Sequence, residues 1–217
     1  MKEVCGFLPA IVVDNVDPQN SGRVKVRFTD ADSRNEEHEE VWARIAALTA
    51  GNDRGTWLLP EINDEVLVAF QGGDGRQYYL IGALWSAGNP PPVSNDHQNA
   101  TKLLRLRSGM QITLSEERAR DSFSIETTNG QKLGLHDGPD GVEISDSSGN
   151  RVTLDGASIK INAPAKVVIN ASTIELNAGM IEVNAGLAKF AGVIQCETLI
   201  SNSVISASYT PGAGNIW

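Results

Sequence analysis

The chain has 217 residues, enough for one large domain or two small ones. It carries 18 Lys and Arg against 27 Asp and Glu, a formal net charge of −9, and this acidity disfavours a protein that binds by neutralising phosphates. Aromatic residues make up only 6%, and there are 21 glycines, a composition typical of a soluble chain rich in turns. No apolar run approaches the roughly 18 to 20 residues that span a bilayer.

The apolar run at residues 4–13 predicts a first strand rather than a signal peptide, because Pro9 interrupts it and no small-residue cleavage site follows it. Cys5 and Cys196 lie near opposite ends of the chain and offer neither a disulfide framework nor a metal-binding spacing. We therefore expect synthesis in a reducing cytoplasm, and an ordinary secreted enzyme is disfavoured.

The first 88 residues predict a small all-β domain. Alternation is clearest at residues 22–28, where Val24, Val26 and Phe28 share one face of a strand and basic residues share the other. Five strands without a helical period suit a small closed barrel such as the OB-fold. The expected strands lie at residues 5–14, 22–28, 41–46, 65–70 and 78–85.

A proline run then separates this region from a second one of different character. Three consecutive prolines at residues 90–92 cannot continue a helix or a central strand, so they mark a linker. Beyond it, apolar-x-apolar triplets alternate with turn sequences such as Asn129-Gly130. After residue 156 the triplets recur every seven or eight residues, at 159–161, 167–169, 174–176, 181–183 and 188–190.

This repeat predicts short strands joined by corners. Apolar residues two apart share a face of a strand, whereas a heptad coiled coil places them three and four apart. One copy would leave its inward aliphatic side chains exposed, although burying each is worth about 1.5–3 kcal/mol, and such a stripe marks an interface. We therefore expect a homotrimer; the alternative is a single-chain parallel β-helix, whose coils usually need about 20 residues. The expected interior residues are Ile159, Ile161, Val167, Ile169, Ile174, Leu176, Ile181, Val183 and Phe190.

Residues 7–92 carry a series of motifs in a family-specific order. They are VVDNVDP at 12–18, GRVKVRF at 22–28, VWARI at 41–45, LPEINDEVLVAF at 59–70 and GALW at 82–85. This series resembles the opening of the baseplate assembly protein V and VgrG family of spikes, and residues 101–115 resemble the strand that leads into the family's needle. The later repeats fit the family by pattern only.

The resemblance implies an all-β chain with an N-terminal OB-fold barrel and an intertwined trimeric β-helix. The expected parts are a collar at 1–88, a linker at 89–101, hairpins and needle at 102–205, and a tip at 206–217. It also implies a place in a virion tail baseplate or equivalent injection particle, contacts with hub and tail proteins, and puncturing of the target cell envelope. The tip either caps the needle or binds a partner such as a PAAR-type tip protein, through Tyr209, Pro211, Gly214, Ile216 and Trp217.

The chain departs from some family members in ways that bear on chemistry. The interval between collar and needle is far too short for the lysozyme domain that some tail spikes carry. None of His38, His97 and His136 lies near the C-terminus or forms a His-x-His pair, so we predict no metal at the tip. His38 sits in an acidic run that lacks the second histidine of a zinc protease.

Two other function classes compete with a structural spike. A trimeric tailspike enzyme that cuts polysaccharide needs two convergent carboxylates, and the repeats offer only Glu175 and Glu182, on adjacent outward positions. A nucleic-acid-binding OB-fold needs stacking aromatics, but the collar holds more acidic than basic residues. Core packing is the better account of its aromatics, Trp42, Trp57, Tyr78 and Tyr79. We predict a non-enzymatic homotrimer with no catalytic site, cofactor, metal or nucleic acid.

Overall fold

The computed structural model describes residues 5–29, 40–72, 77–95, 97–118, 120–138 and 141–207. It divides into two compact units, Met1–Val167 and Val168–Trp217. Every regular element in the described ranges is a β-strand. Accordingly, these ranges contain no helix of the length and hydropathy needed to cross a membrane.

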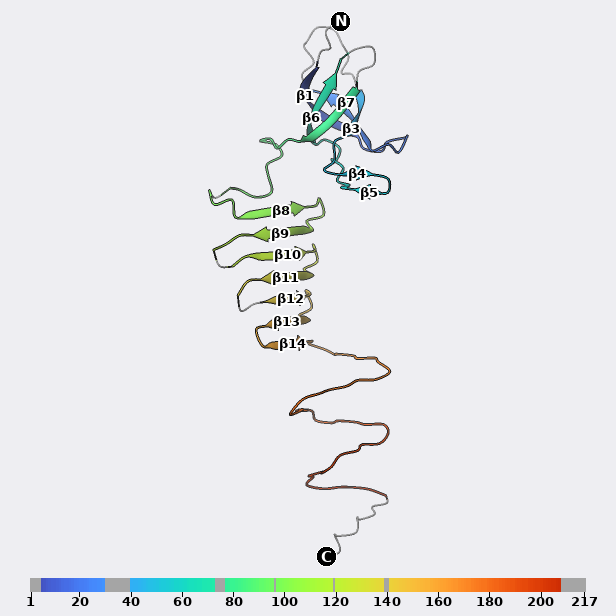
Figure 1. Cartoon of the computed structure of the whole chain (residues 1–217), viewed down its shortest axis with the longest axis vertical. Helices are drawn as coiled ribbons and strands as arrows, with labels where there is room; N and C mark the ends of the chain where they lie inside the picture. The colour runs from blue at the N-terminus through green and yellow to red at the C-terminus, as the bar shows by residue number, and fades with distance from the viewer. Residues whose placement is uncertain are drawn as a thin grey trace, which may run out of the picture. The chain divides into compact units, whose positions relative to one another are not determined.

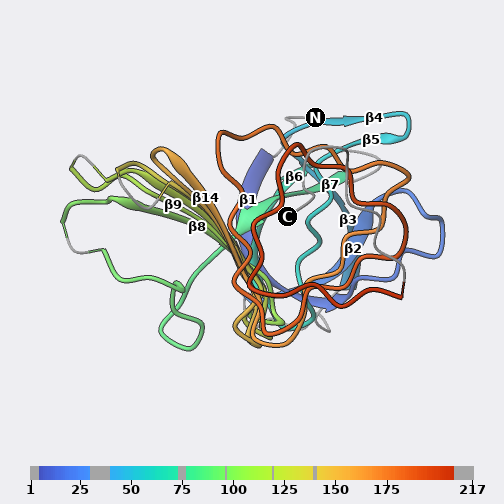
Figure 2. The ribbon, with the colours of Figure 1, turned by 90° about the horizontal axis from the view of Figure 1, so that it is seen from below.

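Five strands near the N-terminus close into a barrel, as the sequence predicts. They follow one another around the barrel in the order β1-β2-β3-β7-β6, and Figure 2 shows them as a ring. The β3–β7 pair is parallel and the other neighbours are antiparallel. The strands are β1 (Cys5–Asp14), β2 (Arg23–Phe28), β3 (Glu40–Ile45), β6 (Glu65–Gln71) and β7 (Gln77–Ala83).

The barrel core is small and is built mainly from valine. Along β2 the inward side chains of Val24 and Val26 are fully buried, whereas the alternate basic side chains point outward. This is the face that the alternating pattern predicts, because successive side chains of a strand point to opposite sides of the sheet. The fully buried large side chains are Val12, Val24, Val26, Val66 and Val68.

A short hairpin interrupts the barrel between β3 and β6. It consists of β4 (Ala50–Gly51) and β5 (Arg54–Gly55), which pair antiparallel. The sequence predicts no strands here, because two-residue strands carry no periodic signal. The hairpin and its flanking loop form one side of a groove that is described below.

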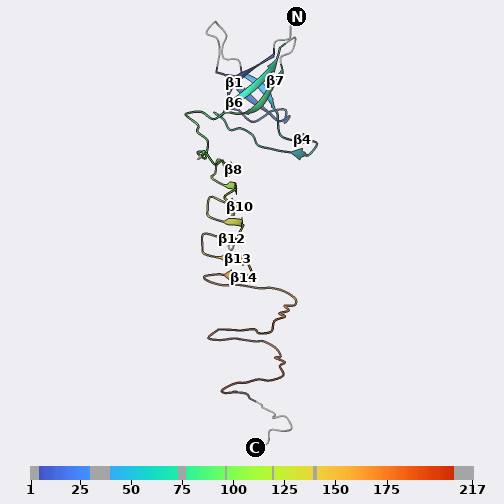
Figure 3. The same cartoon turned by 60° about the vertical axis from the view of Figure 1, so that its left-hand side comes forward.

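A seven-stranded antiparallel sheet follows, with its strands in simple chain order from β8 to β14. Figures 1 and 3 show them stacked like the rungs of a ladder. Gly130 has a φ of +80° in the turn between β10 and β11, as expected of the predicted Asn-Gly turn. The strands are β8 (Thr101–Arg105), β9 (Gln111–Ser115), β10 (Ser122–Glu126), β11 (Lys132–His136), β12 (Val142–Ser145), β13 (Arg151–Asp155) and β14 (Ser158–Asn162).

The chain changes character after β14. None of the described residues from 163 to 207 lies in a strand, and Figures 1 and 3 draw this segment as a winding trace without arrows. The sequence predicts short strands at these repeats, but a strand needs a neighbour for its backbone N–H and C=O groups, and the described residues of one copy give this segment none. The strand pairing of this segment therefore stays a prediction about the trimer. The predicted tip residues and His38 lie outside the described residues.

Candidate functional site

One face of the ladder is almost wholly apolar. The pairing register aligns the alternate residues of each strand with those of its neighbours, so that they form two straight columns on one face. The first column is Leu104, Ile112, Ile125, Leu133, Ile144, Val152 and Ile161. The second is Lys102, Leu114, Phe123, Leu135, Val142, Leu154 and Ile159.

The opposite face of the same sheet is polar. Its central column is Leu103, Thr113, Ser124, Gly134, Glu143, Thr153 and Lys160, in which only Leu103 is a large apolar residue. The Ser145 hydroxyl donates a 2.7 Å hydrogen bond to Glu143 Oε1, and this bond lowers the pKa of the Glu143 carboxyl. One face is thus suited to water and the other is suited to burial.

In the part of the chain that the structure describes, much of the apolar face is left exposed. Ile144 keeps 52% of its surface exposed, and Leu114, Leu135 and Leu154 are also exposed. Ile125, Leu133, Ile144 and Val152 line a shallow groove of about 440 Å³ on this face. A contiguous exposed apolar surface of this extent marks a protein–protein interface.

The structure places the predicted interior residues in two settings. Ile159 and Ile161 lie on β14 and complete the two apolar columns. The other seven lie in the segment without strands, where their side chains are 53–69% exposed and are not brought together in one copy.

Sequence reasoning missed most of this apolar face, because it assigned the interior only from Ile159 onward. The signal was present: apolar-x-apolar triplets occur at 112–114, 123–125, 133–135, 142–144 and 152–154. The antiparallel hairpins superpose these triplets in register, which turns a local motif into a continuous face.

The titratable groups of the described residues suggest no reaction. No cluster of three or more His, Cys, Asp or Glu side chains among them could hold a metal ion. Glu175 and Glu182 are exposed, and each accepts a hydrogen bond from the asparagine amide two residues later, at 3.0 Å from Asn177 and 2.8 Å from Asn184. The two carboxylates repeat one local geometry, as expected of successive repeats.

The collar aromatics are placed differently from the prediction. Only Tyr78 packs against the barrel core, where its ring lies 5.8 Å from that of Phe28. Trp42 points outward beneath the Arg23 guanidinium at 5.4 Å, and Arg44 lies 5.9 Å from the ring centroid of Tyr79. Trp57 is exposed. The prediction of core packing was wrong for these three, because they occupy the outward positions of strands or a loop.

A closed OB-like barrel joined to a ladder with one uncovered apolar face defines a subunit of an oligomeric spike. Comparison with known protein families agrees with this class. Residues 8–85 match the type VI secretion system and phage-baseplate injector OB domain. Residues 122–188 match the phage baseplate V C-terminal trimerisation domain. The chain therefore belongs to the phage baseplate V and VgrG-like family of spike proteins.

Curated relatives match less than half of the chain. The chain is 37% identical over 86 residues to the type VI secretion system spike protein VgrG3 of Vibrio cholerae, and 39% identical over 79 residues to VgrG2a of Pseudomonas aeruginosa. It is 34% identical over 85 residues to the actin cross-linking toxin VgrG1 of Vibrio cholerae. These matches cover 36–39% of this chain but only 8–9% of the relatives' own lengths.

Proposed function

We propose that this chain is the structural, membrane-puncturing spike at the centre of a contractile-tail baseplate or an equivalent injection apparatus. In this proposal it works as a non-enzymatic homotrimer. The observation that carries the proposal is the pair of apolar columns on the ladder, which one chain leaves uncovered within a region that matches a trimerisation domain.

The proposed trimer buries each apolar face against those of two other copies. When three such faces meet on one axis, they form a closed prism. Each apolar face is then covered by the other two copies, so a second sheet from the same chain is not needed. We propose the collar at 1–88, the linker at 89–101, the needle at 102–205 and the tip at 206–217. Ile159 and Ile161 end the two columns on β14, and the other seven predicted interior residues then continue them toward the tip.

The hydrogen bonding of the ladder suits it to carry a mechanical load. Each strand is hydrogen-bonded to the next from β8 to β14, and antiparallel bonds run perpendicular to the strands. A load along the stack is therefore carried by backbone hydrogen bonds and by side-chain packing at interior density. A trimer built in this way resists bending during contraction.

The proposed partners follow from the family. The collar would contact the hub and other tail proteins, the tip would bind a PAAR-type protein or cap the needle, and the needle would enter the target cell envelope. The chain would be made in the bacterial cytoplasm and assembled into the baseplate.

Enzymatic functions have less support. The name of one relative describes an actin cross-linking toxin, but the match to it covers 8% of that protein. For a tailspike enzyme, the candidate acids Glu175 and Glu182 are exposed, and each is hydrogen-bonded to the asparagine two residues later. A nucleic-acid-binding role is disfavoured by the net charge of −9.

The molar mass of the purified full chain, measured by light scattering, tests the proposal. We expect three times the 23.2 kDa of one chain. Ile174→Asp should abolish the trimer, because it would bury three like charges near one axis. Glu175→Gln, one position away on the outward side, is the matched control and should leave the mass unchanged.

Function is tested in the particle that carries the chain. A particle with Ile174→Asp should fail to assemble or to penetrate target cells, whereas one with Glu175→Gln should behave as wild type. A heat-resistant monomer, or a stable trimer of Ile174→Asp with unchanged melting, would contradict the proposal.

A further inference from the structure

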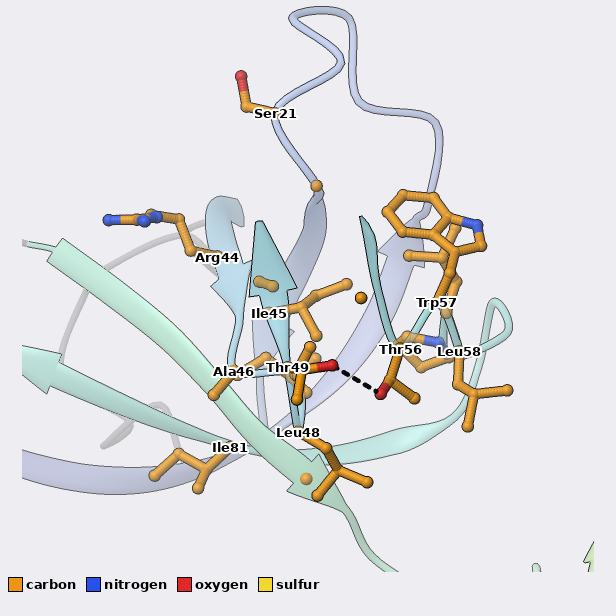
Figure 4. A pocket seen from close by; sticks show the side chains of 18 of the residues that line it. Ser21, Arg44, Ile45, Ala46, Leu48, Thr49, Thr56, Trp57, Leu58 and Ile81 are labelled. Atoms are coloured by element: carbon orange, nitrogen blue, oxygen red, sulfur yellow. Dashed lines mark hydrogen bonds between the residues drawn. The ribbon is translucent and has the colours of Figure 1, made fainter. Parts of the chain in front are cut away.

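The barrel carries an apolar groove that the ladder interface does not use. Its volume is about 980 Å³, and it lies between the loop at residues 46–60 and the ends of β3 and β7. Figure 4 shows Leu48 and Ile81 on one side of the groove and Trp57 and Leu58 on the other, with Ile45 between them. Leu48 is 90% exposed and Trp57 is 68% exposed.

The loop that carries these side chains has a defined shape. The Thr56 amide donates a 2.9 Å hydrogen bond to the Thr49 carbonyl, and the two threonine hydroxyls lie 3.5 Å apart (Figure 4). Gly55 has a φ of +146°, and a Cβ there would lie 2.5 Å from the Thr49 carbonyl oxygen. The close backbone approach therefore requires glycine. The loop at residues 46–60, called the arm below, is thus folded in a way that holds Leu48 outward.

Two charged groups on this arm have no ion-pair partner within the part of the chain that the structure describes. Asp53 and Arg54 both line the groove, and neither forms a salt bridge with a described residue. Arg44 lines the groove as well and contacts the ring of Tyr79 rather than a carboxylate. An apolar centre with charges of both signs around it is the usual anatomy of a protein interface.

We propose that this groove is the contact between neighbouring collars, and that Leu48 of one copy packs against Trp57 and Leu58 of the next. The inference rests on the trimer of the proposed function. In a ring of three, each contact joins two different patches, because only a two-fold interface joins a patch to itself. Each barrel offers two such patches, on the two sides of one groove.

A second copy is the occupant that the chain itself supplies. The linker at residues 89–101 has thirteen residues and reaches at most about 45 Å, so three needles joined on one axis keep their collars within reach of each other. Tethering of this kind gives effective concentrations in the millimolar range. A contact built from few side chains is therefore enough to close the ring, with Asp53 of one copy free to pair with Arg54 of its neighbour.

Cross-linking of the full chain tests this contact. In a Cys5→Ser, Cys196→Ser background, we would combine Leu48→Cys with Trp57→Cys and treat the protein with a short bis-maleimide. Both positions are exposed in one chain, so the substitutions leave the barrel core intact. We expect covalent dimers and trimers on a denaturing gel, since each Leu48→Cys would lie beside Trp57→Cys of another copy.

The matched control combines Leu48→Cys with Val16→Cys, which is also exposed but does not line the groove, and it should give mainly monomer. Monomer alone from the first pair, with a trimer mass by light scattering, overturns this inference and leaves the proposed function standing. A monomer mass before cross-linking overturns both.

Discussion

The carboxylate of Asp17 accepts two hydrogen bonds from the guanidinium of Arg23, at 2.7 Å from Nη2 and 3.1 Å from Nε. The backbone amides of Gln19 and Ser21 donate to the same carboxylate, and its side chain is only 5% exposed. Arg23 in turn lies over the ring of Trp42. One side chain therefore holds the β1–β2 turn and the outer face of the barrel together.

The Asp17–Arg23 pair predicts how barrel stability depends on pH. The hydrogen bond from Arg23, supported by the two amides, holds the pKa of Asp17 well below its ordinary value of 3.8. Because the folded pKa lies below the unfolded one, the stabilisation is fully present above about pH 5, begins to be lost near pH 4 and continues to be lost as pH falls toward the folded pKa. Asp17→Asn should lower the melting temperature at pH 7 by several degrees, and its difference from wild type should shrink between pH 4 and pH 2.

Glu40→Gln is the control for this effect. Lys25 lies 2.7 Å from Glu40 and lowers the pKa of Glu40, but the Glu40 side chain is partly exposed and water screens the pair. Calorimetric scans of the two variants across this pH range should show a clearly smaller loss for Glu40→Gln. Equal losses would mean that the buried geometry of Asp17 contributes nothing.

The stability loss caused by Ile144→Ala distinguishes a trimer from a single uncovered sheet. In one chain Ile144 is half exposed, and truncating it would cost only about 1 kcal/mol, roughly half of the value for a fully buried aliphatic side chain. Buried in a trimer, the same truncation should cost about 2–5 kcal/mol per copy. Denaturant unfolding monitored by circular dichroism measures the loss, and Glu126→Gln, at an exposed position on the opposite face, should remain close to wild type.

Gly141 and Gly156 form a second matched pair, since their φ angles are +50° and +53°. A Cβ at Gly141 would lie 2.0 Å from the carbonyl oxygen of Leu154, whereas one at Gly156 would meet nothing within 4 Å. Gly141→Ala should therefore displace β12 from β13 and reduce trimer yield, while Gly156→Ala should bear only the dihedral cost of about 1 kcal/mol. Size-exclusion chromatography of both variants checks this, and equal trimer yields would contradict the register.

Val26→Ala tests the barrel core separately from the needle. Val26 is fully buried, so removing two methyl groups should cost about 2–3 kcal/mol of barrel stability. Val16→Ala, at an exposed position, should change the barrel by less than about 0.5 kcal/mol. If the collar and needle melt in separate transitions, only the collar transition should move in Val26→Ala.

The barrel could be predicted closely because its signals are local. Strict alternation at Val24 and Val26 shows which side of β2 is buried, and the five expected strands agree with the observed ones to within two residues at nearly every end. The β4–β5 arm could not be predicted, since two-residue strands are defined by one hydrogen-bonded turn and leave no period in the sequence.

The apolar face of the ladder could be predicted only in part. Each triplet, such as 133–135, was visible as a strand core, but its partner depends on register, which the turns determine. Aromatic placement failed for the same reason: Trp42 and Tyr79 differ from core residues only in which side of their strands they occupy. The alternating pattern of a strand shows which residues share each of its two sides. Tertiary pairing decides which other residues cover each side.

The order of the strands in the ladder determines how the length of the proposed spike can change. Neighbouring strands of a sheet are spaced about 4.8 Å apart, so one hairpin of two strands extends the stack by about 10 Å. A hairpin returns the chain to its starting direction and to the same side of the sheet. Insertions or deletions of whole hairpins between β8 and β14 would therefore retune the reach of the spike in steps of that size, without altering the collar or the distal repeats.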